Sequence, residues 1–282
     1  MKRIFILGTF AISFLLQAAQ YEFGVIADAG NWNKNTVQVR DAMLRGNVLN
    51  LVMAGDNLYE GNSYSAMWDP WLTQGFWFDV TAIGNHNLSY QDEIEYFDMP
   101  AEYYSKAYGN AVRFIVLNSD NEKNVNEQMK FLEAELIASQ EPFIFLMYHH
   151  PTFSLSHLHS WKEKKEFQKA IRPLLKRYRS KITSLILGHD HLALVAHFDD
   201  LPVIMNGATQ ELRRDFPVNR KQSGVKVKTN WFFDRKPYWV KMVVDDVLGT
   251  AKFDYIRATD DALRCTVTIQ TGLAAALGEN CK

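Results

Sequence analysis

The chain has 282 residues, of which 47% are hydrophobic and 22% are charged, as in ordinary globular proteins. This length suits one large domain or two small ones and supports a core without disulfides. The net charge of −1 excludes an overall basic field of the kind that recruits nucleic acid or an acidic membrane surface.

The amino-terminus has the three parts of a secretory signal. Positions 2 and 3 are basic, the stretch Ile4–Leu16 is apolar, and small residues precede Gln20. The apolar stretch is short for a membrane span, and no Cys lies beside the cleavage zone to carry a lipid anchor. We therefore expect 1–19 to be a signal peptide, the protein to be exported to the periplasm or secreted, and 20–282 to form a single domain. The alternative is that the apolar stretch is a buried first strand.

Short apolar runs of strand length alternate with helical patterns along the chain. The expected strands are Phe23–Ala27, Leu49–Ala54, Val80–Ile83, Val112–Leu117, Phe143–Tyr148, Ser184–Leu187, Val203–Met205, Tyr238–Val244, Ala251–Ile256 and Cys265–Gln270. The expected helices are Thr36–Arg45, Asn124–Ser139 and Trp161–Tyr178, and Pro173 is predicted to kink or interrupt the last one. This order predicts a mixed α/β fold.

Metal-binding residue types follow five of these strands directly. The strands are followed by Asp28, by Asp56 with Tyr59, by Asn85 with His86, by His149, and by His189 with His191. The carboxyl ends of strands in α/β sheets share one edge, where sites form, so we expect these side chains to converge.

The distribution of histidine supports a metal site. All eight His lie between His86 and His197, and imidazole is the commonest metal ligand. Each short motif alone is more often a turn than a site, but five in this order, each at a strand end, are not expected by chance. Gly55, Gly84 and Gly188 are predicted to permit the sharp turns that present the ligands.

This ordered set resembles the calcineurin-like metallophosphoesterases, and more narrowly the purple acid phosphatases, including the tartrate-resistant type. No His follows Asp28 by two residues, and Tyr59 follows Asp56 by three. In the resembled branch a Tyr phenolate takes the place of that missing His. The resemblance covers about residues 22–210 and implies an α/β fold of four layers, α/β/β/α, in which two mixed sheets are flanked by helices.

The resemblance also implies two metal ions and their ligands. The first metal, typically Fe3+, would be held by Asp28, Asp56, Tyr59 and His191. The second, typically Fe2+, Zn2+ or Mn2+, would be held by Asp56, Asn85, His149 and His189, so that Asp56 bridges the two.

Two neighbouring histidines compete for one of these positions. The family pattern His-x-Pro ends here at Pro151, which selects His149 rather than His150 as the ligand. His150 would then lie behind the site or on the surface.

Three further histidines are candidate catalytic residues by resemblance. His86 would contact the phosphate and help to protonate the leaving group, although Asn87 follows it where the family often has an acid. Either His157 or His159 would be the other histidine on the phosphate side, with a surface loop as the alternative, because the spacing from His149 does not match cleanly.

The function expected from these residues is hydrolysis of phosphate monoesters, of acid phosphatase type, in which hydroxide held by the metals attacks phosphorus. The partner would be a small phosphorylated substrate, with no nucleic acid and no stable membrane anchor, and a monomer is expected. The alternatives are a phosphodiesterase or nucleotide hydrolase on the same scaffold, or a non-catalytic metal-binding module.

The two cysteines, Cys265 and Cys281, lie far from the histidines, which argues against a metal role. They either close one loop near the carboxyl terminus, as an oxidising compartment permits, or stay unpaired.

Overall fold

The computed structural model describes residues 20–154, 156–159, 163–210, 227–232, 235–271 and 275–281. The predicted signal peptide, residues 1–19, lies outside this part of the chain. In the described part, no helix is long and apolar enough to cross a membrane.

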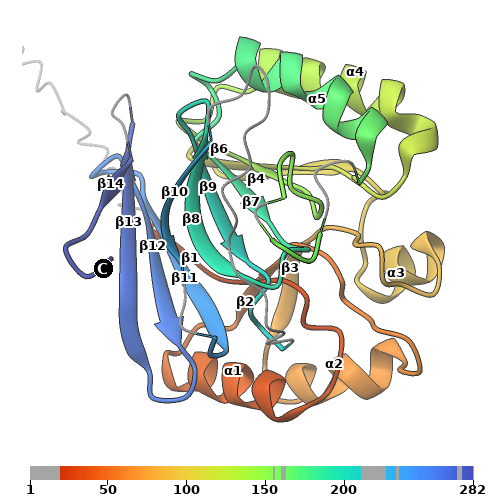
Figure 1. The fold of residues 1–282 in the computed structure, drawn as a ribbon, viewed down its shortest axis with the longest axis vertical. Helices are drawn as coiled ribbons and strands as arrows, with labels where there is room; N and C mark the ends of the chain where they lie inside the picture. The colour runs from red at the N-terminus through yellow and green to blue at the C-terminus, as the bar shows by residue number, and fades with distance from the viewer. Residues whose placement is uncertain are drawn as a thin grey trace, which may run out of the picture.

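Two seven-stranded mixed sheets form the centre of the molecule (Figure 1). Sheet A has the order β14-β13-β12-β11-β1-β2-β3. Its strands are β1 (Gln20–Ile26), β2 (Asn50–Met53), β3 (Trp77–Thr81), β11 (Tyr238–Asp245), β12 (Thr250–Arg257), β13 (Ala262–Gln270) and β14 (Ala276–Leu277). Strands β1, β2 and β3 run parallel, whereas β11 to β14 form an antiparallel meander.

Sheet B has the order β10-β8-β9-β7-β6-β5-β4. Its strands are β4 (Tyr104–Tyr108), β5 (Val112–Val116), β6 (Phe143–Met147), β7 (Ser184–Leu187), β8 (Ala193–Phe198), β9 (Leu201–Asn206) and β10 (Val227–Phe232). Strands β5, β6, β7 and β9 run parallel, and β4, β8 and β10 are antiparallel to their neighbours.

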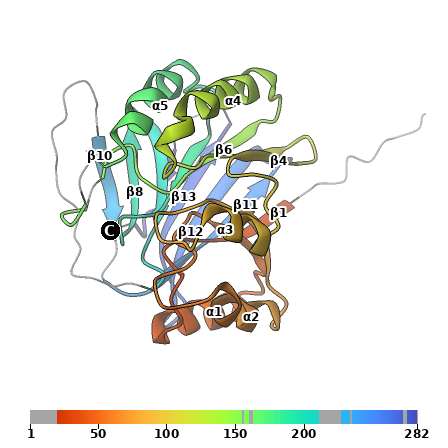
Figure 2. The same ribbon diagram turned by 90° about the vertical axis from the view of Figure 1, so that its right-hand side faces the viewer.

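The helices cover the outer faces of the two sheets (Figures 1 and 2). They are α1 (Lys34–Arg45), α2 (Tyr64–Leu72), α3 (Tyr90–Tyr96), α4 (Val125–Ala138) and α5 (Lys165–Arg177), with a short 3-10 turn η1 (Glu122–Asn124) before α4. Helices α4 and α5 lie side by side outside sheet B, and α1 and α2 lie on the opposite side of the molecule. The predicted four-layer α/β/β/α sandwich is confirmed.

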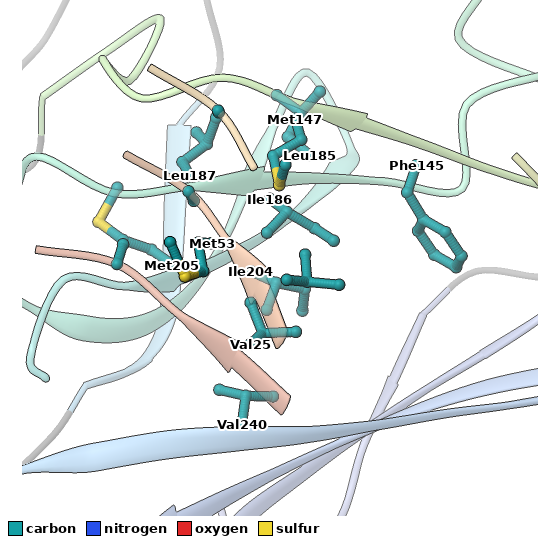
Figure 3. Close-up of a cluster of buried hydrophobic side chains, with 14 of the residues drawn as sticks. Val25, Met53, Phe145, Met147, Leu185, Ile186, Leu187, Ile204, Met205 and Val240 are labelled. Atoms are coloured by element: carbon teal, nitrogen blue, oxygen red, sulfur yellow. The ribbon is translucent and has the colours of Figure 1, made fainter. Parts of the chain in front are cut away.

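The core lies between the two sheets (Figure 3). Val25 and Val240 of sheet A and Leu185 and Ile204 of sheet B are at most 1% exposed. Burying each such side chain contributes about 1.5–3 kcal/mol relative to leaving it in water. Sheet A and sheet B are thereby fixed against each other, and so are the loops that leave their strands.

Helix α5 differs from its prediction in two ways. It begins at Lys165 rather than Trp161, because Glu163 and Lys164 form a turn, and Trp161 itself lies outside the described residues. It is also continuous across Pro173, so the predicted interruption is wrong. Pro173 deprives the Lys169 carbonyl of its N–H partner. Both residues are exposed, so the freed carbonyl lies on the solvent side of the helix.

Cys265 and Cys281 form a disulfide, with Cα atoms 4.3 Å apart. The bond joins buried Cys265 of β13 to the end of the chain, which settles the pairing that the sequence left open.

Candidate metal centre

The predicted ligands lie together along one edge of the sandwich, which we call the rim. Strands β1, β2 and β3 of sheet A and β6 and β7 of sheet B all end there. Hydrogen bonds join the loops that leave them: the N–H of Asp28 donates to the carbonyl of Gly55, and the N–H of Gly188 donates to the carbonyl of His149.

A first group of oxygen and nitrogen atoms surrounds the end of β1. Asp28, Asp56 and His191 each offer one ligand atom, and these atoms lie within 4.8 Å of one another. The Tyr59 hydroxyl lies 3.3 Å from both Asp56 Oδ2 and His191 Nε2. The four residues predicted for the first metal are thus neighbours.

A second group lies on the other side of Asp56. His149 Nε2 is 3.1 Å from Asp56 Oδ1, and His189 Nδ1 is 3.1 Å from Asn85 Oδ1. The rings of His149 and His189 lie 5.2 Å apart. Asp56 lies between the two groups, as a bridging ligand must.

The donor atoms fit metal ions. Asp28 Oδ1 and His149 Nε2 are buried without a hydrogen bond of good geometry in the part of the chain described here, although His149 Nε2 forms an ion pair with Asp56. Leaving such atoms unpaired costs about 1–3 kcal/mol each, a cost that a bound cation removes. Mixed carboxylate, phenol, amide and imidazole donors suit iron, zinc or manganese.

The backbone at the rim is held in an uncommon conformation. Asp28, Asp56 and His189 have φ angles of 54°, 53° and 69°. Left-handed φ costs a non-glycine residue of order 1 kcal/mol or more and persists only where the surroundings enforce it. Gly84 is required for a different reason: a Cβ there would lie 2.2 Å from Asp56 Oδ1. The glycine therefore permits close approach of the β3 loop to the bridging carboxylate.

Electrostatics keeps Asp56 ionised and His149 protonated at neutral pH in the metal-free rim. Burial raises the pKa of Asp56, but the charge of His149 and the N–H of His86 outweigh this and hold the pKa well below its usual range. Burial lowers the pKa of His149, but the Asp56 charge outweighs it and raises that pKa to about 9. Burial lowers the pKa of His189 to about 4, although its hydrogen bond with Glu163 opposes this. His189 is therefore neutral at pH 7 and has a lone pair for a metal.

One of the two candidate catalytic histidines on the loop after β6 contacts the rings of predicted ligands. The His159 ring lies 4.1 Å from that of His189 and 5.9 Å from that of His191. His157 and His159 are both half-buried. The ring contacts of His159 make it a candidate for the substrate side of the rim.

The other two histidines near the rim are both held by specific contacts. The backbone N–H of His86 donates to Asp56 Oδ1, and its ring lies 4.6 Å from the Tyr59 ring. His150 is buried and contacts Ser119 through Nδ1 at 2.9 Å, so the surface location considered for it is wrong. It lies behind the site, with its ring 4.4 Å from that of His189.

Sequence reasoning missed two acids at the rim. Glu163 Oε2 lies 2.6 Å from His189 Nε2. Buried Asp190 accepts hydrogen bonds from Ser154 Oγ at 2.9 Å and from the N–H of Ser156 at 3.1 Å, which fastens the loop after β6 over the rim. Asp190 lies in sequence between two predicted ligands, and this position could have marked it as a residue of the rim. No sequence signal marked Glu163.

Comparisons with known proteins show similarity in structure only. No protein-family model matches the chain, and no curated protein matches it. The structure of GAP50, described as the anchor in the inner membrane complex of Plasmodium, is similar with a TM-score of 0.73 and 15% identity, over 90% of each chain. A dimetal phosphatase from Danio rerio has a TM-score of 0.58 and 14% identity, over 89% of this chain and 99% of its own. PhoD has a TM-score of 0.60 and 12% identity, over 92% of this chain and 71% of its own. The chain therefore shares its fold with GAP50, with a dimetal phosphatase and with PhoD.

Proposed function

We propose that the protein is a dinuclear-metal hydrolase of phosphate monoesters, of the purple acid phosphatase type. The observation that carries the proposal is the convergence of six ligand-type side chains on two sides of a seventh, the buried carboxylate of Asp56. Similarity of fold to a dimetal phosphatase adds support.

Two metal ions would supply positive charge that stabilises the phosphate and would activate a water molecule at modest pH. Around them, Asp28, Asp56 and Tyr59 provide anionic oxygens, while the histidines and Asn85 are neutral ligands. We assign Fe3+ to the Tyr59 side and Fe2+, Zn2+ or Mn2+ to the other.

His86 and His159 are the residues that we place on the substrate side. Each lies beside the ligand rings, and each would hold a proton near the phosphate or its leaving group. Asn87 donates its side-chain N–H to the carbonyl of Gly84, so it stabilises the turn that carries His86.

Hydrolysis of an aryl phosphate monoester by the metal-loaded protein tests the proposal. Activity should disappear on chelation and in Asp56→Ala. The control Asp41→Ala removes an acid from a partly exposed ion pair with Arg40 on α1 and should leave activity unchanged. A higher rate on a bis-aryl phosphate would favour the diesterase alternative.

A binding or anchoring role is the second candidate, because GAP50, which has this fold over nearly the whole chain, is described as an anchor. A protein that binds two metals but hydrolyses neither ester would support it.

In the iron-loaded protein, a visible charge-transfer band that is lost in Tyr59→Phe would support the purple branch. A band that persists would remove Tyr59 from the ligands.

We also propose that the protein is exported and acts as a monomer on small phosphorylated substrates. The pattern of residues 1–19 and the disulfide, which suits an oxidising compartment, support export. Amino-terminal sequencing of the mature protein tests it: a start near Gln20 is expected, and a start at Met1 would refute it.

A further inference from the structure

Both ring nitrogens of His189 have a polar neighbour. Nδ1 lies 3.1 Å from Asn85 Oδ1, on the side where the second metal is expected. Nε2 lies 2.6 Å from Glu163 Oε2, on the opposite side of the ring. The His189 side chain is 8% exposed and that of Glu163 is 39% exposed, so the ring is shielded from water while the carboxylate is partly solvated.

The carboxylate selects one tautomer of the ring. An ionised carboxylate only accepts hydrogen bonds, so Nε2–H donates to Glu163 and the lone pair stays on Nδ1. His149 shows the reverse arrangement. Its Nδ1 donates to the carbonyl of Ala54 at 2.8 Å, which leaves Nε2 to face Asp56. In each case an acceptor behind the ring determines which nitrogen faces the metal.

Glu163 is held in place by contacts away from the rim. Its carbonyl accepts a hydrogen bond from the side chain of buried Gln168, 2.6 Å away, and Gln168 also donates to the carbonyl of Pro151. The next residue, Lys164, has a φ of 50° and forms an ion pair with Asp120. These contacts fix the backbone where helix α5 begins, so the carboxylate is directed at His189 before any metal binds.

We propose that Glu163 is a positioning residue for the second metal: it holds His189 in the tautomer and orientation that metal binding needs. The proposal rests on the function proposed above. It adds to the predicted ligands a carboxylate behind His189, so that carboxylate, histidine and metal would form one line of contacts. Loss of such a carboxylate behind a histidine ligand typically weakens metal affinity about 10- to 100-fold.

The experiment compares Glu163→Ala and Glu163→Gln with a matched control, Glu166→Ala. Glu166 lies three residues further along, is exposed, and contacts Glu122 through its backbone N–H, which the substitution retains. Zn2+ binding to the metal-free proteins is measured by calorimetry and by competition with a chelator. The tautomer of His189 is read by 15N NMR of the ring nitrogens.

In Glu163→Ala we expect one of the two Zn2+ sites to weaken about 10- to 100-fold, and the Nε2–H tautomer to lose its dominance. Glu163→Gln retains a neutral acceptor, so it should keep the tautomer and lose less than about 10-fold in affinity. The control should bind both ions as the wild type does.

Wild-type affinity at both sites in Glu163→Ala and Glu163→Gln would overturn the proposal, as would equal weakening of both sites or an unchanged tautomer in Glu163→Ala. If Glu163→Ala does not fold, weakening of only one Zn2+ site in Glu163→Gln supports the proposal, and wild-type affinity at both sites or loss of the tautomer in that variant overturns it. Wild-type protein that binds two ions without hydrolysing an ester would refute the proposed function alone, because the binding and tautomer measurements do not depend on turnover.

Discussion

Glu93 of α3 is a buried acid behind the rim, and its removal should stabilise the protein. The side chain is fully buried, Oε1 accepts a hydrogen bond from Asn57 at 2.6 Å, and Oε2 has no hydrogen-bond partner among the described residues. Burial is the main cause that raises the pKa of Glu93 from its usual 4.5 to about 8, and the nearby Asp56 charge adds to it. In Glu93→Gln the amide keeps the acceptor for Asn57 and carries no titrating proton.

The sign of the pH effect follows from where the proton is bound. Between the unfolded pKa of 4.5 and the folded pKa of about 8, the unfolded chain releases the Glu93 proton while the folded chain keeps it. The wild type therefore loses stability as pH rises through this window and loses no more above it. At 1.36 kcal/mol for each pKa unit, the gain from Glu93→Gln should be about 1 kcal/mol at pH 5, about 3 at pH 7 and 4 to 5 at pH 9.

Urea unfolding of the metal-free proteins at these three pH values measures the difference. The control is Glu95→Gln, which makes the same charge change on α3 at an exposed residue bonded only to Gln91 within the described chain. That substitution should change the free energy of unfolding by less than about 0.5 kcal/mol at every pH. A gain from Glu93→Gln that does not grow between pH 5 and pH 9 would refute the reasoning.

Three further predictions concern the rim and the carboxyl terminus. Gly84→Ala places a Cβ 2.1 Å from the backbone nitrogen of Asp56 and should reduce both metal content and hydrolysis, the latter by about 100-fold. An unchanged metal content would contradict this. Asp190→Asn removes the charge that holds two hydrogen bonds of the loop after β6 and should speed limited proteolysis of that loop about 10-fold, whereas unchanged cleavage would show that other contacts hold it. Cys281→Ser opens the bond to Cys265, 16 residues away, and should lower the free energy of unfolding by about 3 kcal/mol in urea. Reduction of the wild type should give the same loss, and a smaller loss in both would refute the estimate.

The sequence predicted the central strands because each is a continuous apolar run that ends at a polar turn. Ser184–Leu187 was predicted at its observed bounds, and other runs differ by one to three residues at their ends. Helices α2 and α3 were missed. Helix α2 is rich in aromatics and contains Pro70, and α3 is seven residues long, so neither shows a clear apolar stripe. The strand order within each sheet depends on pairing between distant segments, which periodicity does not encode.

The site was more predictable than the order of the strands, because metal ligands must be particular residue types at particular strand ends. The convergence of Asp28, Asp56 and His189 at one edge was predicted in this way, although their left-handed φ angles were not, since only the folded loops impose them. Glu163 and Asp190 were missed for a related reason. A residue that orients a ligand must only contact that ligand in the folded protein, so it can come from many positions in the sequence.

The cost of building the rim explains why the rest of the sandwich is so fully packed around it. Three predicted ligands in left-handed conformation, and buried Asp28 Oδ1 without a hydrogen bond among the described residues, each oppose folding by roughly 1–3 kcal/mol. In the metal-free chain the core between the sheets offsets that sum. The ion pair between His149 and Asp56 neutralises part of the rim, and bound cations would neutralise the rest. Metal binding to this rim is therefore favoured by what folding has already imposed, and an ion that binds the folded state alone stabilises it in turn.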